Sequence, residues 1–345
     1  MAEPGLLDRL RSGPVICAEG YLFELERRGY LQAGAFVPEV VLEHPEMVAG
    51  LHREFIHAGS DVVEAFTYYA HREKLRLIGR EAELEVINRE ALRIAKDVAA
   101  ESGALFAGDV CNTNVFTPGD AAAVTSTRRM FEEQVGWAAE GGVDFVIAET
   151  LSWGGEALLA LDAIKAAGLP AVVTLAIHRD AHTWEGWTPA DACRRLEEAG
   201  ADVVGLNCAR GPRTMLPLLE AIRGEVTGPM AALPVPYRTT EEQPTFQSLR
   251  DPREPSADVM PFPTALDPFT CTRDEMGRFA STAHAMGIDY VGVCCGAGPH
   301  HIRSVAEALG RTPPASRYGA DMSKHAYFGT DPGIGSEQRD HAAKL

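Results

Sequence analysis

The chain lacks a long uninterrupted run of apolar residues, and its start lacks a basic block followed by an apolar one. Although 46% of the 345 residues are hydrophobic, no run approaches the roughly 20 apolar residues that a membrane-spanning helix needs. The first eight residues, Met1 to Asp8, do not resemble a signal peptide. These absences predict a cytoplasmic protein with no membrane partner.

Positive charge and cysteine are also scarce. Lysine and arginine number 32 against 49 acidic residues, which gives a formal net charge of -17. A protein that neutralises phosphates needs clustered basic side chains, so nucleic acid is excluded as a partner, and the acidity is interpreted as an aid to solubility. Seven cysteines are too few, and odd in number, for a disulfide framework, which indicates a reducing compartment.

Two of those cysteines, Cys294 and Cys295, are adjacent. They lie within Gly-Val-Cys-Cys-Gly-Ala-Gly (292–298), after an apolar run at 288–291 that is typical of a buried parallel strand. Neighbouring glycines let the backbone bend, so that both thiols can converge on one point as a soft metal requires. The alternative is two small core residues, because free cysteine is often buried.

A short pattern of glycine, any residue, aspartate and two mostly β-branched or aromatic residues recurs four times. Its copies are 59–63, 142–146, 200–204 and 287–291. Each follows an amphipathic helical stretch, as expected for a tight helix-to-strand connection. Further apolar strand candidates lie between the copies, at 15–17, 105–108, 171–175 and 230–233. Eight alternating units predict an α/β protein with a (β/α)8 TIM barrel.

The repeat also predicts a register. Six residues after each aspartate come Thr67, Thr150, Cys208 and Cys295. Alternate strands of a TIM barrel contribute side chains to one inward layer, so these four should meet at the C-terminal mouth. Cys208 thereby joins Cys294 and Cys295 as a third thiol, and three thiolates with one open position suit a zinc ion.

Two details qualify this register. Cys294 and Glu149 lie five residues after their aspartates, so regular alternation would turn them outward unless the strand ends bend. Gly296 makes such a bend plausible for Cys294. His300 and His301, at the start of the next helix, are interpreted as solvated residues rather than ligands.

Several segments resemble the zinc-dependent homocysteine S-methyltransferases, above all the members that use glycine betaine. The similar segments are Leu206-Asn207-Cys208, 292–296, 299–303, 26–30, 43–46, 51–59, 66–70 and 147–149. The similarity covers roughly residues 10 to 325. It implies that Cys208, Cys294 and Cys295 hold Zn2+, that the zinc binds the homocysteine sulfur, and that a small onium compound donates the methyl group to give methionine.

The resemblance also implies the other site residues. Glu149 takes the catalytic position and should bind the substrate amino group. Phe36 and Tyr69, with Tyr68 beside them, should line the donor pocket, where aromatic faces hold a cation. The remaining substrate-binding candidates are Glu19, Gly20, Glu64 and Thr150.

The chain departs from the betaine-using pattern at four places. These are Ala18-Glu19-Gly20 for an Asp-Gly-Gly turn, Phe36 for a tryptophan, Glu64 for a glutamine and Thr150 for a tyrosine. Trp184 and Trp187 could rebuild an aromatic cage or could cap a helix. Other onium donors therefore stay open, namely dimethylsulfoniopropionate, S-methylmethionine and proline betaine, as does another thiol acceptor.

The domain prediction is a homocysteine-binding barrel at 1–312 and a C-terminal tail at 313–345. The long proline-rich segment 237–269 is interpreted as a lid. The tail resembles the start of an oligomerisation extension, which makes a homo-oligomer possible. Two other functions stay open: a zinc-binding or redox-sensing protein without catalysis, and a metal-free barrel enzyme that uses Glu149 and Glu64 as acid and base.

Overall fold

A ring of eight parallel strands forms the centre of the protein. The structure is a computed structural model that describes residues 4–253, 256 and 259–344. The strands are β1 (Val15–Ala18), β2 (Val62–Glu64), β3 (Leu105–Cys111), β4 (Phe145–Leu151), β5 (Ala171–Leu175), β6 (Val203–Asn207), β7 (Met230–Leu233) and β8 (Tyr290–Val293). They pair in the order β1-β8-β7-β6-β5-β4-β3-β2. The Asp61 amide donates to the Ile16 carbonyl at 2.8 Å and links the two ends of this order. The predicted (β/α)8 barrel is confirmed.

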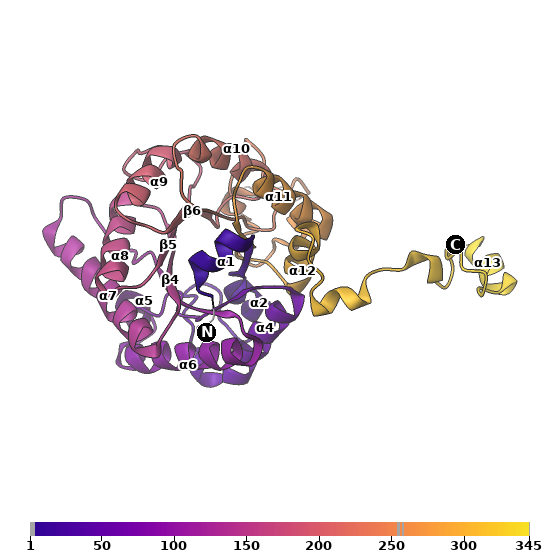
Figure 1. The fold of residues 1–345 in the computed structure, drawn as a ribbon, viewed down its shortest axis with the longest axis horizontal. Helices are drawn as coiled ribbons and strands as arrows, with labels where there is room; N and C mark the ends of the chain where they lie inside the picture. The colour runs from indigo at the N-terminus through magenta and orange to yellow at the C-terminus, as the bar shows by residue number, and fades with distance from the viewer. Residues whose placement is uncertain (1–3, 254–255, 257–258, 345) are drawn as a thin grey trace.

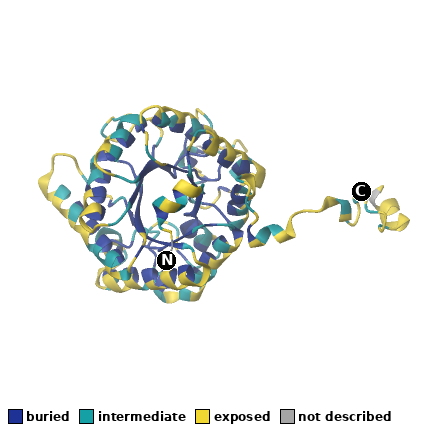
Figure 2. Ribbon diagram, viewed as in Figure 1, coloured by how far each residue is buried: buried dark blue, intermediate teal, exposed yellow. Residues whose placement is uncertain are grey.

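Helices surround the strands as an outer ring (Figure 1). The helices, of which α1 and α13 lie outside that ring, are α1 (Leu6–Ser12), α2 (Tyr21–Arg27), α3 (Val40–Glu43), α4 (Pro45–Ala58), α5 (Arg72–Leu77), α6 (Leu84–Ser102), α7 (Ala121–Gly141), α8 (Gly154–Ala166), α9 (Pro189–Glu198), α10 (Pro212–Arg223), α11 (Arg273–Ala285), α12 (Pro299–Ala308) and α13 (Ser336–Ala342). Short 3-10 turns are η1 (Glu81–Glu83), η2 (Phe246–Ser248), η3 (Asp267–Phe269), η4 (Pro314–Tyr318) and η5 (Met322–Lys324). Figure 2 shows buried strands inside helices whose outer faces are exposed. This two-sided burial explains why the strands are apolar without alternation.

The recurring glycine–aspartate pattern has a physical cause in this fold. All four pattern glycines have positive φ, from 76° to 115°. They lie at or directly after the C-terminal end of the preceding helix, where glycine allows the chain to turn. Three of the aspartates then accept a hydrogen bond from the first amides of the strand before them. Asp61 accepts from Ile16 N at 2.7 Å, and Asp144 accepts from Phe106 N at 2.8 Å. Asp202 does the same for Ala171 N, also at 2.8 Å. Each of these three copies thus fastens two neighbouring strands at their N-terminal ends.

Helix α1 lies across the middle of the ring in Figure 1. The Arg9 guanidinium donates to the Gly103 carbonyl at 2.8 Å, in the connection that leads into the N-terminal end of β3. The N-terminal end of the barrel is therefore covered, and the C-terminal ends of the strands form the other face, where the active sites of TIM barrels lie.

Two segments lie outside the regular βα units. The predicted lid, apart from 254–255 and 257–258, which fall outside the described residues, packs an aromatic cluster against α2. In that cluster Phe246 contacts Phe23 and Phe262, with ring centroids 5.9 and 5.0 Å apart. The tail after α12 runs away from the ring (Figure 1) and exposes Tyr318 and Phe328. No helix among the described residues is long and apolar enough to cross a membrane.

A buried histidine on α4 should make the fold sensitive to acid. His52 is 1% exposed, and neither ring nitrogen has a hydrogen-bond partner among the described residues. Burial lowers the pKa of His52 to about 3. Below about pH 6.5 the His52 side chain is therefore protonated in the unfolded chain but not in the native protein. The free energy of unfolding then falls as the pH drops below 6.5.

Replacing His52 with glutamine should remove this sensitivity. Between pH 6.5 and pH 5 the wild type should lose about 2 kcal/mol more unfolding free energy than His52→Gln. Urea midpoints of the metal-loaded protein at the two pH values measure this difference. The exposed His57 on the same helix gives the control, His57→Gln, which should follow the wild type. An equal loss of unfolding free energy between pH 6.5 and pH 5 in His52→Gln and wild type would contradict the prediction.

Candidate active site

Three thiols meet at the C-terminal ends of β6 and β8. The sulfur atoms of Cys208, Cys294 and Cys295 all lie within 4.8 Å of one another. Cys208 and Cys294 are buried, whereas Cys295 is partly exposed toward the mouth. Tetrahedral zinc with Zn–S distances near 2.3 Å places its sulfurs about 3.8 Å apart, so the donor set fits a zinc ion. Among the described residues no histidine joins this group.

Irregular backbone conformations bring the thiols together. Cys208 and Ala209 both have left-handed φ angles, of 53° and 52°. Such a conformation costs a residue other than glycine about 1–2 kcal/mol, and it turns the chain just where β6 ends. Gly296 has φ 93°, and a Cβ there would lie 2.3 Å from the Tyr237 hydroxyl. The bend expected beside Cys294 is therefore present.

Gly20 explains how the thiol loop is held beside β1. A Cβ on Gly20 would lie 2.4 Å from the Ala297 carbonyl oxygen, so only glycine permits this contact. The structure thus gives Gly20 a packing role at the site. It places Gly20 next to the loop that carries Cys294 and Cys295.

The thiols influence one another's ionisation. Hydrogen bonds from the Cys294 and Cys295 thiols lower the pKa of Cys208 well below its usual range. Burial raises the pKa of Cys294. One thiolate, Cys208, is therefore stabilised before a metal arrives, which favours the first metal–sulfur bond.

Four buried carboxyl groups lie beside the thiols. They are Glu19 after β1, Glu64 on β2, Asp109 on β3 and Glu149 on β4, each at most 5% exposed. Burial raises the pKa of Glu19 to about 8. It also raises the pKa values of Glu64, Asp109 and Glu149, and neighbouring carboxyls add to the rise. Sequence reasoning missed Asp109, although its place at the end of an apolar strand was a usable signal.

Asn207 connects the carboxyls to the thiols. Its side-chain nitrogen lies 2.5 Å from Glu149 Oε2 and 3.1 Å from Glu19 Oε2, in position to donate to both. The same nitrogen lies 3.8 Å from Cys294 Sγ. Asn207 is fully buried. In the sequence, Asn207 stood out only as part of a segment that resembles the family. An amide side chain at the end of an apolar strand was itself a sign of a functional residue.

Glu149 points inward because β4 is irregular at that point. The pairing of β4 with β5 shifts register between Ala148 and Leu151. Thr150 has φ 56°, its amide donates to Asn207 Oδ1 at 2.9 Å, and its hydroxyl donates to Glu149 Oε2 at 2.9 Å. This bulge resolves the conflict with regular alternation. Thr67 lies deeper in the wall, where its hydroxyl donates to the Asp109 carbonyl at 2.7 Å.

The expected aromatic residues are only partly brought together. Tyr68 lines the pocket between the carboxyls and Cys295. The face of Tyr69 instead lies under the Lys74 ammonium, 4.0 Å from the ring centroid. Phe36 stacks on Phe23 at 5.8 Å, as part of the packing beneath the long segment. Neither Tyr69 nor Phe36 lines the pocket of the carboxyls.

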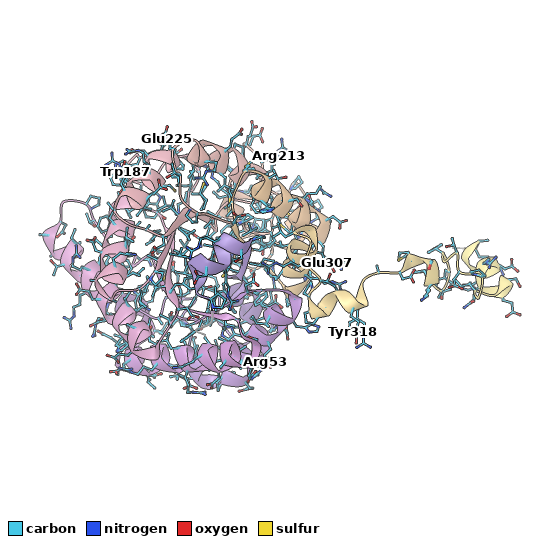
Figure 3. The ribbon with its side chains drawn as sticks, viewed as in Figure 1. Arg53, Trp187, Arg213, Glu225, Glu307 and Tyr318 are labelled. Carbon is cyan, nitrogen blue, oxygen red and sulfur yellow. The ribbon has the colours of Figure 1, made fainter. Side chains whose placement is uncertain are left out.

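The two tryptophans after β5 have different roles. Trp187 packs over Gly154 at the start of α8, and the Arg195 guanidinium lies 4.4 Å from its ring centroid. Figure 3 places Trp187 at the outer edge of the ring. Trp184 is exposed, stacks on His178 at 5.4 Å and lines a hollow on the mouth side. Trp187 therefore packs against helices, and only Trp184 faces the mouth.

The histidines of α12 belong to the helix start. The Gly298 amide donates to His301 Nδ1 at 3.2 Å, and His301 Nε2 lies 3.2 Å from the Cys271 carbonyl oxygen. Both ring nitrogens of His301 are therefore engaged away from the thiols. The interpretation of both histidines as solvated is wrong for His301, which is 1% exposed because it packs at the helix start, whereas His300 is exposed.

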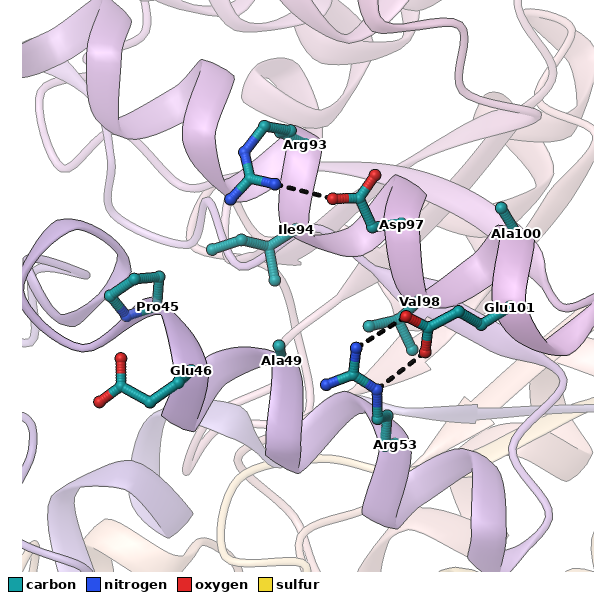
Figure 4. A pocket seen from close by; sticks show the side chains of 10 residues that line it. All are labelled: Pro45, Glu46, Ala49, Arg53, Arg93, Ile94, Asp97, Val98, Ala100 and Glu101. Carbon is teal, nitrogen blue, oxygen red and sulfur yellow. Dashed lines mark hydrogen bonds and ion pairs between the residues drawn. The ribbon is translucent and has the colours of Figure 1, made fainter.

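A broad groove on the outer wall, of about 720 Å³, lies between α4 and α6 (Figure 4). Its charged side chains pair with each other: Arg53 with Glu101 at 2.8 Å and Arg93 with Asp97 at 2.7 Å. No thiol or unpartnered buried group lines it, so the chemistry lies at the mouth.

These features define a class of protein, a TIM barrel with three thiols and buried carboxyls at the mouth. The model of the homocysteine S-methyltransferase family matches residues 17–309. The chain belongs to the homocysteine S-methyltransferase family, and the predicted family and the predicted methyltransferase activity are confirmed.

Similar proteins agree with this assignment. A betaine–homocysteine S-methyltransferase of Danio rerio is 37% identical, across 100% of this chain and 86% of its own length. An S-methylmethionine–homocysteine S-methyltransferase of Pongo abelii is 34% identical, across 95% of this chain and 87% of its own. The oxidized form of a homocysteine methyltransferase from Escherichia coli has a TM-score of 0.66 at 19% identity, covering 87% of this chain and 97% of that one. The last comparison supports the fold.

Proposed function

We propose that this enzyme transfers a methyl group from a small onium compound to the thiol of homocysteine and gives methionine, with Zn2+ held by Cys208, Cys294 and Cys295. The observation that carries the proposal is the group of three thiols beside a pocket of buried carboxyls. Bound zinc would ionise the acceptor thiol, which is otherwise mostly protonated at neutral pH.

The chain's own residues supply binding and orientation. Glu149 and Glu19 lie next to Cys294, with ligand atoms within 4.8 Å, so they can hold the ammonium group of an amino acid whose sulfur points at the thiols. Asn207 fixes both carboxylates. Methyl transfer between sulfur and an onium centre needs no proton at the carbon, so alignment supplies most of the rate.

The identity of the methyl donor is supported less directly. The aromatic residues expected to surround it, Phe36 and Tyr69, lie outside the pocket of the carboxyls. Relatives named for glycine betaine and for S-methylmethionine are similarly close in sequence. We propose an onium donor whose charged group enters the pocket beside Tyr68.

A metal and donor assay tests the function. Protein purified without chelator should contain about one zinc per chain and should form methionine from homocysteine with at least one onium donor. Glycine betaine, S-methylmethionine and dimethylsulfoniopropionate form the panel. Zinc removal by a chelator should stop methionine formation, and added zinc should restore it. A zinc-free protein with full activity would contradict the metal assignment.

We further propose a cytoplasmic location and a role of the tail in oligomer formation. All seven cysteines are unpaired, which supports a reducing compartment. The tail at 313–345 carries exposed Tyr318, Met322 and Phe328 away from the barrel. Such exposed apolar groups support contact with a second copy of the chain.

A further inference from the structure

The pocket beside the thiols combines acidic and aromatic walls. Its lining residues are Glu19, Tyr21, Leu22, Glu64, Ala65, Phe66, Tyr68, Asp109, Glu149 and Cys295. None of these side chains is basic. Carboxylates together with aromatic faces are the surroundings that bind organic cations.

Three of the four carboxyls, including Glu19 through its Oε1, have at least one oxygen without a hydrogen-bond partner among the described residues. Both carboxyl oxygens of Glu64 and one of Asp109, Oδ1, accept no hydrogen bond from the described residues. These side chains are only 2% and 4% exposed. A buried polar group without a partner is costly, so the pair indicates a ligand that supplies positive charge.

The four carboxyls divide into two sides that share Glu149. On the thiol side, Glu19 and Glu149 group with Cys294, their ligand atoms within 4.8 Å of one another. On the far side, Glu64 and Asp109 group with Glu149 within the same distance, and Glu64 also groups with Glu19 and Cys17, so the two sides adjoin. The thiol side suits the acceptor's ammonium group. The far side is then left for a second cation, and Tyr68 and Cys295 line the same pocket.

We propose that Glu64 and Asp109 form the binding site for the onium group of the methyl donor, and that they select a donor of net positive charge over a zwitterion. This inference rests on the proposed methyl transfer. The onium group of a bound donor favours the ionised forms of these buried carboxyls. The carboxylate of a zwitterionic donor such as glycine betaine would then lie near two negative charges that have no basic partner, and like charges repel strongly in a buried site. A cationic donor avoids that repulsion.

Two sulfonium compounds that differ only in a carboxylate test the inference. Trimethylsulfonium is a simple cation, and dimethylsulfonioacetate is the corresponding zwitterion. In each reaction the bond between the donor sulfur and one methyl carbon breaks, its electron pair stays on that sulfur, and the acceptor thiolate forms the new carbon–sulfur bond. The leaving groups are the neutral thioether dimethyl sulfide and the thioether (methylthio)acetate. No oxidant or reductant is needed.

We expect the zinc-loaded wild type to use trimethylsulfonium with a kcat/KM at least about tenfold above that for dimethylsulfonioacetate. The double variant Glu64→Gln/Asp109→Asn should lose most of this preference, through a higher donor KM for trimethylsulfonium. Zinc content and the homocysteine KM should stay near wild type, which shows that the thiol side is intact. The exposed ion-paired carboxyls Asp97 and Glu101 give the control Asp97→Asn/Glu101→Gln, which should keep the preference.

Calorimetric titration with unreactive tetramethylammonium provides a readout that does not depend on turnover. Tetramethylammonium should bind the zinc-loaded wild type, and its affinity should be at least about tenfold lower in the double variant. This result would support the site. Equal use of both sulfonium compounds by wild type, or tetramethylammonium binding unchanged in the double variant, overturns the inference and leaves the proposed function standing. Absence of methionine from every donor, with zinc bound and tetramethylammonium binding intact, overturns the proposed function instead.

Discussion

Replacing Cys208 with serine is expected to abolish zinc binding and methyl transfer together. A structural zinc site contributes roughly 10–16 kcal/mol of binding free energy, so losing one thiolate removes about 4 kcal/mol, or a factor of about a thousand. Cys208 is also the thiol whose pKa its two neighbours lower, so its loss removes the pre-ionised ligand. Metal analysis after dialysis and methionine formation at saturating homocysteine measure the two effects.

Cys271 provides the matched control. It is buried like Cys208 but lies outside the thiol group, before α11. Cys271→Ser should keep its zinc and its activity, even if it unfolds at lower urea. Full zinc content and activity in Cys208→Ser would rule out the three-thiol site. A loss of both in Cys271→Ser as well would point to a general loss of structure.

Replacing Asn207 with aspartate is expected to lower kcat/KM for homocysteine by about a hundredfold or more. The side-chain nitrogen of Asn207 is the donor shared by Glu149 and Glu19, and a hydrogen bond to a charged group contributes roughly 1.5–3 kcal/mol. The aspartate would replace that donor with a further negative charge among buried carboxyls. Both effects disturb the two carboxylates that face the acceptor.

The pH profile separates this positioning role from a structural one. A protonated aspartate can donate a hydrogen bond again, so Asn207→Asp should regain activity relative to wild type as the pH falls. Zinc content should change less than kcat/KM. Asn114→Asp, in the exposed loop after β3, is the control for an added charge and should behave like wild type. An Asn207→Asp profile parallel to wild type would show that the amide does not position Glu149 and Glu19.

Much of the fold could be predicted because its signals are local and repeated. The glycine–aspartate pattern marks the end of a helix, and three of its aspartates hold the amides of the preceding strand. Each copy therefore records one connection of the barrel in a few neighbouring residues. The same spacing also placed Cys208 near Cys294 and Cys295, because strand ends in a barrel share a common height.

The rest of the site depends on backbone irregularities that a pattern does not show. Phe36 and Tyr69 were expected in the donor pocket, but both adopt positive φ angles, and their rings pack against Phe23 and under Lys74. A left-handed residue other than glycine has no sequence mark, because it is stabilised by contacts from distant segments. The family resemblance therefore indicated the region of these aromatic rings but not their direction.

The sequence by itself determined the barrel and the three thiols, because both depend on residue types at regular spacing along the chain, and it determined the family through segments that resemble known members. Only the tertiary structure decided what lies opposite the thiols. It turned Glu149 inward through the bulge at Thr150, placed Asn207 between two carboxylates and brought Asp109 beside Glu64. The reason is physical: the direction of a side chain at a strand end depends on one or two backbone torsions, and packing from the whole barrel sets those torsions.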